Sequence, residues 1–245
     1  MTERARNPLV QSLSACFPCY NDADTIGSMV DGVHAALAPI VDDLEVVVAN
    51  DGSQDGSAAV LDEMATTRPW LRVVHHEANR GYGGALRSAF GEASKEWVFY
   101  TDGDAQYDAS EAADLVQLVT ADVDVVQGWK IERGDAWYRK VVGRVYHHVV
   151  KRLFNLHLRD TDCDFRLIRR ELLERTRLRS TSGVICVEMM RKLERAGARF
   201  VEAPVHHFHR PSGRSQFFRL PAIARTAREL LRLWWDLIVR ARPDQ

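Results

Sequence analysis

Short apolar runs alternate with helical patterns through the first half of the chain, and this alternation restricts its fold more than any other feature. The apolar runs span residues 12–17, 44–49, 71–75, 97–101 and 123–127, and the helical patterns span residues 25–37, 57–67, 82–93 and 110–119. Strands and helices that alternate at this spacing form βαβ units. We therefore expect an α/β fold with a mostly parallel central sheet and helices on both of its faces.

The pattern changes after Trp129. A basic amphipathic helix is expected over residues 136–155, and it is followed by an apolar and basic segment, DCDFRLIRREL. A further helix is expected around residues 184–196 and a strand over residues 199–205. No repeat and no linker rich in Pro, Gly or Ser separates the two halves of the 245-residue chain, so we treat it as one domain.

Charge differs between the two halves. Residues 1–129 carry 7 Lys and Arg against 21 Asp and Glu, whereas residues 130–245 carry 26 against 13, although the formal net charge of the whole chain is only −1. A basic half of this kind meets anions such as phosphates, acidic lipid headgroups or nucleic acid. Because it lacks the aromatic stacking surface or recognised module of nucleic-acid-binding proteins, we expect no nucleic-acid partner.

The cysteine count and the hydropathy of the chain point to a cytoplasmic protein. Four cysteines in a chain of this length do not form a disulfide framework, and the first residues, MTERARNPLVQ, lack the apolar stretch of a signal peptide. No apolar run approaches the roughly 18 residues that cross a bilayer, so we expect no integral membrane protein. Cys16 and Cys19 have CxxC spacing, but no second pair completes a zinc site.

A pair of carboxylates follows the fourth apolar run. The segment WVFYTDGDAQY contains Asp102 and Asp104, one residue apart, and then the amide of Gln106. Side chains at i and i+2 of an extended backbone point to the same side, and hard oxygen ligands of this kind suit Mg²⁺ or Mn²⁺ bound to the phosphates of a substrate. The alternative is a polar turn after a strand, because Asp and Gly are ordinary turn formers.

Polar motifs also end the neighbouring strands, where parallel sheets bind their ligands. Asp22 and Asp51 are candidates to accept hydrogen bonds from a base or a ribose, and a turn with a helix N-cap is the alternative for Asp51. In NRGYGGALRSAF, Gly81 precedes a predicted helix, so exposed amides and Arg87 could approach phosphates. The glycine spacing is not that of the dinucleotide fingerprint, and this motif alone is a weak signal.

Taken together, the motifs resemble the family 2 glycosyltransferases with a GT-A fold, and most of all the dolichol- or polyprenol-phosphate sugar transferases. The matching segments, collinear from residue 13 to residue 218, are FPCYND, VVVANDGSQDGSA, NRGYGGALRSAF, FYTDGDAQYD, QGWKIERGDAWYRKVVGRVYHHVVKRLFNL, RDTDCDFRLIRREL and PVHHFHRPSGRSQF. The resemblance implies a metal-dependent, inverting transfer of a sugar from a nucleotide diphosphate sugar to a lipid phosphate. It also implies a GT-A domain over residues 1–218, with a nucleotide-sugar half (about 10–129) and an acceptor half (about 130–218), before an amphipathic helix over residues 219–245.

The resemblance, with the patterns above, gives single residues candidate roles. Nucleotide-sugar contacts are expected from Pro18, Tyr20, Asp22, Asp51, Gly81, Arg87, Asp102, Gly103, Arg210 and Ser215. Metal ligation is expected from Asp102, Asp104 and Gln106. The expected acceptor contacts are Lys130, Arg139 and Arg144, and the expected catalytic residues are Asp104, Lys130 and Arg139.

Some positions depart from the family pattern. Asn50 replaces the first aspartate of the D-D-G-S segment, and Asp164 stands where the D-x-x-G-F segment usually has glycine. Gly143 stands where a polar acceptor contact can occur, and Lys130 keeps the charge of an arginine but not its two-pronged geometry. These departures leave the acceptor less defined than the donor.

The kind of acceptor decides whether a catalytic base is needed. A phosphate is already ionised near neutral pH and needs positioning rather than deprotonation. A soluble or glycan hydroxyl, the main alternative, would need a carboxylate base, for which Glu188 and Asp162 are candidates. A structural salt bridge is the competing role for Glu188. A nucleotide-binding protein without turnover is less favoured, because Asp102, Asp104 and Arg210 are all present.

Basic amphipathic patterns in the second half suggest a surface contact. In the predicted helix 136–155, valines and Phe154 recur at helical spacing among Lys and Arg, and residues 220–238 repeat this pattern with Trp234 and Trp235 near the end. Such helices either lie in a membrane interface, as a peripheral contact, or pack on the domain or on a second subunit of a homo-oligomer. His206, His207 and His209 either line the acceptor loop, alternate across the strand, or contribute a metal ligand.

Overall fold

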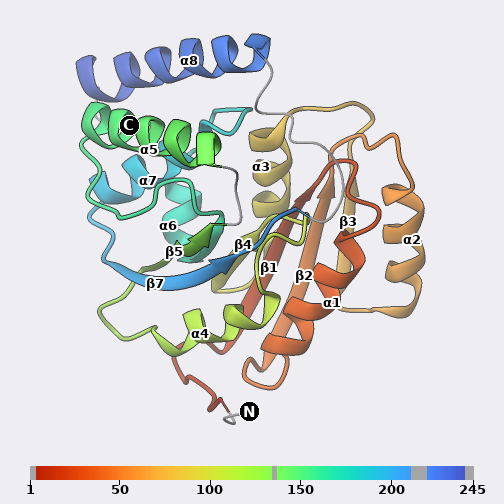
Figure 1. Ribbon diagram of the computed structural model, residues 1–245. Helices are drawn as coiled ribbons and strands as arrows, with labels where there is room; N and C mark the ends of the chain where they lie inside the picture. Colours follow the sequence, from red (N-terminus) through yellow and green to blue (C-terminus); the bar gives the residue numbers. More distant parts are fainter. Residues whose placement is uncertain (1–3, 134–136, 211–219, 241–245) are drawn as a thin grey trace.

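The structure is a computed structural model that describes residues 4–133, 137–210 and 220–240. Within these residues, a seven-stranded sheet in the order β3-β2-β1-β4-β6-β5-β7 forms the centre of the molecule (Figure 1). The strands are β1 (Ser12–Cys19), β2 (Asp43–Asn50), β3 (Leu71–His75), β4 (Trp97–Thr101), β5 (Val125–Arg133), β6 (Phe165–Arg169) and β7 (Phe200–His207). β1 to β4 pair in parallel with one another, as do β5 and β7, which confirms the expected α/β class.

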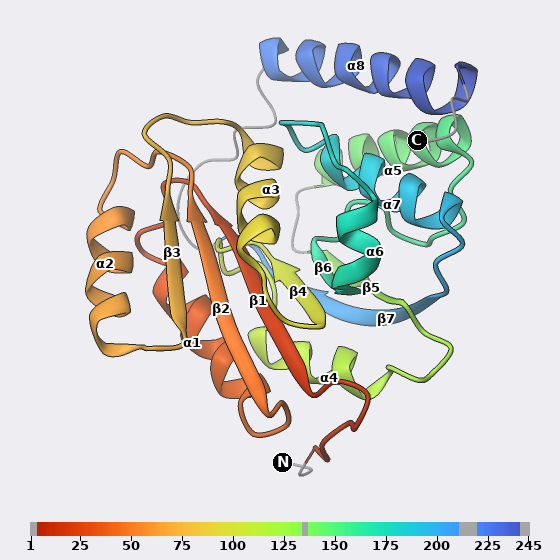
Figure 2. The same ribbon diagram turned by 180° about the vertical axis from the view of Figure 1, so that it is seen from behind.

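Helices cover both faces of the sheet (Figures 1 and 2). The helices are α1 (Ile26–Leu37), α2 (Ser57–Thr67), α3 (Tyr82–Glu92), α4 (Ala112–Gln117), α5 (Trp137–Phe154), α6 (Arg170–Arg175), α7 (Ile185–Arg195) and α8 (Leu220–Trp234), with a 3₁₀ turn η1 (Ala109–Glu111) before α4 and a π-helical turn η2 (Trp235–Val239) after α8. One face carries α1, α2 and α4, and the other carries α3 and α5 to α8.

The central strands β1, β2 and β4 are buried on both faces, because successive side chains point to opposite sides and helices cover both sides of the sheet. In β4, Trp97 and Phe99 belong to the core under α1, α2 and α4, whereas Val98 and Tyr100 belong to the core under α3 and the later helices. A strand with two buried faces is apolar along its whole length, which is why these runs are recognisable in the sequence.

β6 is the strand that the sequence pattern did not indicate. It runs antiparallel to both β4 and β5, in the segment DCDFRLIRREL, and α6 follows it directly. Arg166 interrupts its apolar pattern, yet its side chain is 0% exposed. A buried arginine inside a strand masks the apolar run that marks the other strands, so the tertiary structure, and not hydropathy, defines this element.

α8 lies across the molecule above α5 and α7 (Figures 1 and 2). Its inner side packs against the core under α3 and the later helices through Leu230, Leu233 and Trp234, as does Ile238 of the following turn. Leu237 of the same turn is only 8% exposed. The main apolar side of this helix is therefore covered by the domain itself. Among the described helices, none is both long enough and apolar enough to cross a bilayer.

Candidate functional site

Four of the predicted aspartates follow adjacent strands at one edge of the sheet. We call Asp22, Asp51, Asp102 and Asp104 the carboxylate edge. They follow β1, β2 and β4, and the sheet order β2-β1-β4 places the carboxyl ends of these parallel strands side by side. The sheet thus brings together residues that are up to 82 positions apart in the sequence.

Hydrogen bonds between the loops hold this edge together. The amide of Asp22 donates to Ser57 Oγ over 3.1 Å, which joins the loop after β1 to the start of α2. Thr25 Oγ1 donates to the carbonyl of Gly103 over 2.7 Å, which joins the loop before α1 to the turn after β4. The loops therefore form one connected surface.

Gly103, between the two aspartates, lies close to α1 and to the end of β1. A Cβ at this position would lie 2.6 Å from Ile26 Cδ1, so the end of that side chain would have to shift, and 3.6 Å from the carbonyl oxygen of Pro18, an ordinary contact distance. Pro18 itself is buried near the end of β1, and Tyr20 beyond it is 36% exposed. Glycine therefore lets the turn that carries the two aspartates approach α1 without displacing Ile26.

Asp51 is 1% exposed and its carboxylate has internal partners. Its Oδ1 accepts a hydrogen bond from the amide of Arg80 over 2.8 Å and lies 2.6 Å from His76 Nδ1. His76 Nε2 in turn lies 2.8 Å from Ser88 Oγ on α3. The imidazole therefore holds Asp51 in a fixed orientation at the end of β2.

Asp102 lies among other carboxylates. Burial, and then the charges of Asp164 and Asp104, hold its pKa well above the usual range for aspartate. Tyr82 Oη donates to Asp102 Oδ1 over 2.8 Å and opposes this rise. Burial also raises the pKa of Asp22 to about 6, with Asp104 adding to the rise and Arg210 opposing it. Negative charge at this edge is thus under-compensated by the described residues.

Asp104 has one strong cationic partner. Arg210 Nη2 donates to Asp104 Oδ2 over 2.6 Å, and Nε of the same arginine donates to it over 3.1 Å. Gln106 lies two residues further on, where its Nε2 donates to the carbonyl of Phe208 over 3.1 Å. Metal ligation by Gln106 would use its other side-chain atom, Oε1. These contacts tie the turn after β4 to the segment after β7.

Lys130 lies on β5 against the loop before β6. Its Nζ donates to the carbonyl of Asp162 over 2.5 Å, and its amide lies 3.4 Å from Asp160 Oδ2. Burial lowers the pKa of Lys130, but Asp160 and then the other acidic neighbours outweigh burial, so the pKa lies above its ordinary value. The ammonium group stays charged at neutral pH.

Asp164, which the sequence singled out only as a departure from the family pattern, completes the acidic cluster. Burial raises its pKa to about 6, although the charge of Lys130 opposes the shift. Its Oδ1 accepts a hydrogen bond from Cys186 Sγ at 3.0 Å. Lys130 and Asp102 are thus linked electrostatically through Asp164.

The glycine-rich segment before α3 packs against another loop. Gly81 has a φ of 83°, and a Cβ on it would lie 2.3 Å from the carbonyl oxygen of Thr181. The Gly83 amide donates to the same carbonyl over 2.9 Å. Arg87 is exposed on α3 and donates to the carbonyl of Arg179 over 3.3 Å. Close packing on the loop around residue 181 therefore explains these glycines structurally.

Glu188 supports that same loop. It is 1% exposed, and its carboxylate accepts hydrogen bonds from the amides of Arg179 and Ser180 and forms a 3.0 Å ion pair with Lys192. A carboxylate with this burial and these partners is structural, so the structural alternative raised for Glu188 is the one observed.

The three histidines at the end of β7 and just beyond it contact different partners. His206 pairs with Glu111 through both its backbone amide and its ring, and the ring of His207 packs edge-on against Tyr107. His209 Nδ1 lies 2.8 Å from the carbonyl of Arg210. Among the described residues, no group of three or more His, Cys, Asp or Glu side chains is arranged to hold a metal ion by itself.

Some predicted site residues lie outside what the structure describes. Ser215 falls in the range 211–219, and the side chains of Arg139 and Arg144 on α5 are likewise outside the described set. Their roles remain predictions from the sequence.

The donor atoms at the carboxylate edge fit a divalent cation that arrives with a diphosphate. Mg²⁺ is usually held by one or two carboxylates plus substrate phosphates and water, and Asp102 with Asp104 supply such a pair. The raised pKa of Asp102 shows that its charge lacks compensation, and a cation would supply it.

Sequence reasoning missed Arg166 and His76. Arg166 donates to Gln127 Oε1 over 2.5 Å, to the carbonyl of Thr161 over 2.8 Å and to Tyr100 Oη, and so fixes the loop before β6. Only the burial of Arg166 reveals this role. A signal did exist for His76: it directly follows β3, the same kind of strand-end position as Asp51.

Comparison with known proteins identifies relatives along most of the chain. Residues 14–177 match the family described as Glycosyl transferase family 2. Glycosyltransferase AglD of Haloferax volcanii is 31% identical over 239 residues, which cover 94% of this chain but only 38% of that protein. The undecaprenyl-phosphate 4-deoxy-4-formamido-L-arabinose transferase of Edwardsiella ictaluri is 28% identical over 234 residues, which cover 94% of this chain and 67% of that protein.

Solved structures share the fold. The mannosyltransferase PcManGT from Pyrobaculum calidifontis, solved with GDP-Man and Mn²⁺, superposes with a TM-score of 0.68 at 23% identity, over 99% of this chain and 68% of that one. Glucosyl-3-phosphoglycerate synthase from Mycobacterium tuberculosis, solved with Mn²⁺, UDP and glucosyl-3-phosphoglycerate, gives 0.70 at 18% identity, over 96% and 82%. These likenesses confirm the expected GT-A fold. Because the family match spans more than half of the sequence, the chain belongs to glycosyl transferase family 2.

Proposed function

We propose that the chain moves a sugar, with inversion, from a nucleotide diphosphate sugar to a polyprenyl-type lipid phosphate, with Mg²⁺ or Mn²⁺. The observation that carries this proposal is the carboxylate edge, where Asp102 and Asp104 lie among further carboxylates and Arg210 reaches Asp104. A carboxylate whose pKa is raised by neighbouring carboxylates, as that of Asp102 is, favours the binding of a cation, and a diphosphate supplies the remaining ligands.

The residues of this edge divide the work of donor binding. Asp102 and Asp104 would hold the metal, which when bound neutralises charge on the leaving diphosphate. Asp51, oriented by His76, is placed to accept hydrogen bonds from the nucleoside. Arg210 adds a positive charge beside Asp104, and a fixed cation of this kind stabilises a departing phosphate more than the bound substrate.

The acceptor proposal rests on Lys130 and on the lack of a usable base at Glu188. An ammonium group has three hydrogens, and Lys130 Nζ donates to one described acceptor, the carbonyl of Asp162. Its raised pKa keeps it cationic, as the positioning of a phosphate requires. The carboxylate of Glu188, which a hydroxyl acceptor could have used, is occupied by backbone amides and Lys192.

The relatives support the same substrate classes. The Edwardsiella relative is named an undecaprenyl-phosphate transferase, which favours a lipid phosphate acceptor. The two solved neighbours hold GDP-Man or UDP together with Mn²⁺, which favours a nucleotide diphosphate sugar as donor. They differ in the base, so the donor nucleotide is left open.

An exposed apolar stripe supports a peripheral membrane contact. It consists of Val145, Val149 and Leu153 on α5, and Leu231, Trp235 and Val239 on α8 and η2, with exposures from 37% to 62%. Each set is spaced by four residues and so lies along one side of its helix. α8 lies along α5 in each view, and basic residues flank the apolar ones, as in helices that bind a membrane interface (Figures 1 and 2).

Purified protein tests the reaction directly. It is incubated with Mg²⁺ or Mn²⁺, with UDP-, GDP- and dTDP-sugars in turn, and with or without a polyprenyl phosphate. Release of nucleoside diphosphate that depends on the lipid supports the proposal. Equal release without lipid, transfer to a glycan hydroxyl alone, or nucleotide binding without turnover contradicts it.

The membrane contact has its own test. Leu231→Ser combined with Trp235→Ser should weaken binding to anionic lipid vesicles by about tenfold, because two exposed apolar side chains no longer enter the interface. Leu118→Ser is a matched control, since Leu118 is 39% exposed but lies beyond α4 on the opposite face of the sheet. Vesicle binding that is the same for the double variant and the control contradicts the contact.

A further inference from the structure

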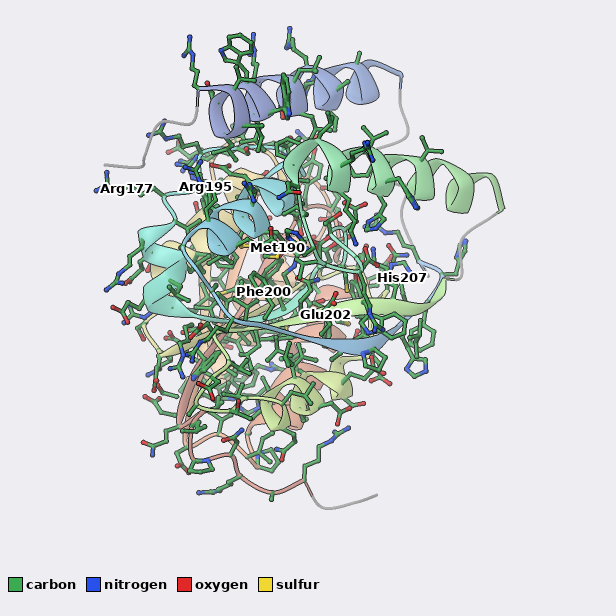
Figure 3. All side chains as sticks on the ribbon, turned by 90° about the vertical axis from the view of Figure 1, so that its left-hand side faces the viewer. Arg177, Met190, Arg195, Phe200, Glu202 and His207 are labelled. Carbon is green, nitrogen blue, oxygen red and sulfur yellow. The ribbon has the colours of Figure 1, made fainter. Side chains whose placement is uncertain are left out.

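A basic groove lies between α8 and the loop after α6. It has a volume of about 1200 Å³, and no residue of the carboxylate edge lines it. We call it the α8 groove; its basic lining residues are Arg175, Arg177, Arg179, Lys192, Arg232 and Arg240. Figure 3 shows Arg177, with Arg195 nearby, beneath the C-terminal end of α8.

The carboxylates of the groove are already engaged. Glu188 accepts backbone amides and pairs with Lys192, and Glu229 accepts a hydrogen bond from Ser182 Oγ. Asp236 lies 3.9 Å from Arg240. Glu188 and Asp236 are therefore paired with cations, whereas Glu229 keeps its charge and is held by Ser182, so the lining retains more positive than negative charge.

Three guanidinium groups of the groove have no ion-pair partner among the described residues. Within the described part of the chain, the side chains of Arg177, Arg179 and Arg232 have no ion pair or hydrogen bond, and all three residues are exposed. Like charges that face one groove repel each other, and a bound anion removes that cost. The groove thus favours an anion that several arginines can share.

The backbone of Arg177 adds an independent observation. Its φ is 43°, in the left-handed region, at the position directly after the helix C-cap Thr176. Glycine or asparagine usually occupies that position, because a larger side chain is disfavoured there. Lys192 Nζ donates to the carbonyls of Thr176 and Arg177, over 3.2 and 3.0 Å, and holds the turn. The backbone at Arg177 is thus strained and held by Lys192, which fixes the position from which its side chain enters the groove.

The loop carrying these arginines is held in place before any ligand binds. Glu188 fixes the amides of Arg179 and Ser180, and Ser182 bonds to Glu229 of α8. Groups that are ordered in advance bind a ligand with a smaller loss of entropy.

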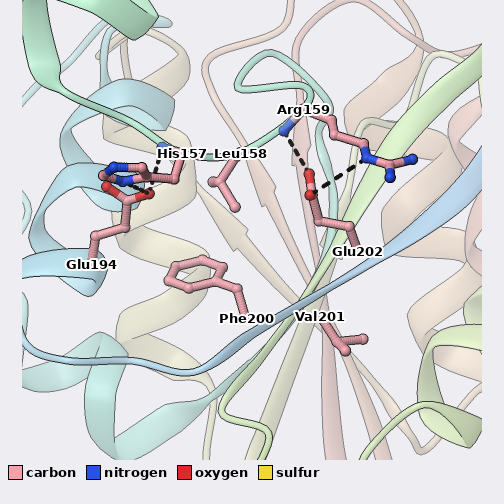
Figure 4. A pocket seen from close by; sticks show the side chains of 7 residues that line it. All are labelled: His157, Leu158, Arg159, Glu194, Phe200, Val201 and Glu202. Carbon is pink, nitrogen blue, oxygen red and sulfur yellow. Dashed lines mark hydrogen bonds and ion pairs between the residues drawn. The ribbon is translucent and has the colours of Figure 1, made fainter.

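A second pocket of the molecule shows the contrast. It has a volume of about 450 Å³ and lies beside the first residues of β7 (Figure 4). There Arg159 pairs with Glu202 and His157 pairs with Glu194, so its charged groups satisfy one another. The unmatched arginines are a property of the α8 groove.

We propose that the α8 groove is a binding site for a phosphate or diphosphate group, held by Arg177, Arg179 and Arg232. The planar guanidinium group matches two phosphate oxygens at once, which favours phosphate over a simple halide. The phosphate belongs either to a lipid headgroup or to a small soluble molecule. This site is separate from the carboxylate edge and does not depend on sugar transfer.

The binding test uses inorganic pyrophosphate and titration calorimetry without divalent metal. All proteins carry Arg210→Ala, which removes the cation beside Asp104, so that any binding that remains there or at Lys130 is the same in every protein compared. Adding Arg177→Ala, Arg179→Ala and Arg232→Ala should weaken binding at least tenfold, since each lost charge-assisted hydrogen bond weakens binding by about that factor. The matched control adds Arg225→Ala and Arg228→Ala, two exposed arginines of α8 outside the groove lining.

The control should bind pyrophosphate as the Arg210→Ala protein does. Unchanged affinity in the groove variant, or an equal loss in the control, overturns the proposal. Arg177→Gly separates binding from folding, because glycine suits the left-handed backbone. This variant should bind pyrophosphate about tenfold more weakly without a lower melting temperature, whereas unchanged binding counts against a role for Arg177.

Vesicles distinguish the two sources of phosphate. Wild-type protein and the groove variant are compared on phosphatidylcholine vesicles with and without phosphatidylglycerol. If the groove variant loses binding to the anionic vesicles and pyrophosphate displaces the wild type, the phosphate is a lipid headgroup. If vesicle binding is unchanged while pyrophosphate binding is lost, the ligand is soluble. Loss of neither refutes the site.

Discussion

The carboxylate edge and the α8 groove are opposites in charge, and they differ in how the chain holds that charge. At the edge, Asp51 and Asp104 are nearly buried and each has a close basic partner, His76 or Arg210. In the groove, Arg177, Arg179 and Arg232 are exposed and have no described partner. Most of the charge of each half thus lies on a separate surface, although Arg210 of the basic half reaches Asp104 at the edge.

The difference teaches how each surface acquires its specificity. At the edge, the pairing of parallel strands fixes the distances between the aspartates that follow them. Carboxylates can therefore be held close together despite their repulsion. In the groove, the positions of Arg177 and Arg179 depend on one loop, which hydrogen bonds from its amides to Glu188 and from Lys192 to its carbonyls hold in place. We expect substitutions at the edge to change chemistry and substitutions at the groove to change binding.

The largest expected effect is at the centre of the edge. Asp104→Asn should lower sugar transfer by about a thousandfold, because it removes a carboxylate proposed to hold the metal and the partner of Arg210. The measurement is release of nucleoside diphosphate at saturating donor. Asp122→Asn, at a carboxylate that is 91% exposed, is the control and should retain full activity. An Asp104→Asn enzyme as active as the control would remove the edge from the mechanism.

A second prediction tests the contact between the glycine-rich segment before α3 and the loop around residue 181, which lines the α8 groove. Gly81→Ala should lower the free energy of unfolding by about 3 kcal/mol, because the new Cβ meets the carbonyl of Thr181 and φ is positive. Urea denaturation measures this change. Gly91→Ala, at a helical glycine with open space around it, should instead stabilise by about 0.5–1 kcal/mol. Equal effects at both glycines would mean that the two loops are not in close contact.

A third prediction concerns the excess negative charge of the edge. The pKa of Asp164 is raised from 3.8 to about 6, so its contribution to stability is fully present below about pH 4 and is lost as the pH rises through 6. In metal-free protein, Asp164→Asn should therefore raise the free energy of unfolding by about 2 kcal/mol more at pH 7 than at pH 4. Denaturation at both pH values gives this difference. A gain that is independent of pH would show that Asp164 is not held among other charges.

The smallest effect is expected where the edge is already internally paired. His76→Ala should raise the KM for the donor by about tenfold with little change in kcat, since Asp51 loses the group that orients it. His76→Asn should restore most of the affinity, because its amide nitrogen can take the place of Nδ1. Steady-state kinetics separates KM from kcat. A loss confined to kcat, or no rescue by asparagine, would argue against orientation of Asp51 by His76.

Much of the first half was predictable. The strands β1, β2 and β4 are largely apolar because both of their faces are buried, and the polar residues that follow them include Asp22, Asp51, Asp102 and Asp104. The second half was less predictable, because β6 was not recognisable from hydropathy. Arg166 is a charged residue in a buried strand, and the hydrogen bonds from its guanidinium group to Gln127 and Tyr100 depend on residues far away in the chain.

The amphipathic pattern of α8 shows the same limit. The sequence left membrane contact and packing on the domain as alternatives for one apolar face. The structure divides that face: Leu230, Leu233 and Trp234 pack inward, while Leu231 and Trp235 face outward. Hydropathy alone cannot divide it, because both sets lie within a few residues of each other on the helix.

The sequence by itself determined the α/β class, the glycosyltransferase family and the four aspartates of the carboxylate edge, because local hydropathy and short motifs encode strands and their ends. Only the tertiary structure decided which charges are paired. It pairs Asp51 with His76 and Asp104 with Arg210, and it places Glu188 against the backbone amides of a supporting loop. Arg177 and its neighbouring arginines instead line an open groove. Pairing depends on distances between residues remote in sequence, and those distances exist only once the chain has folded.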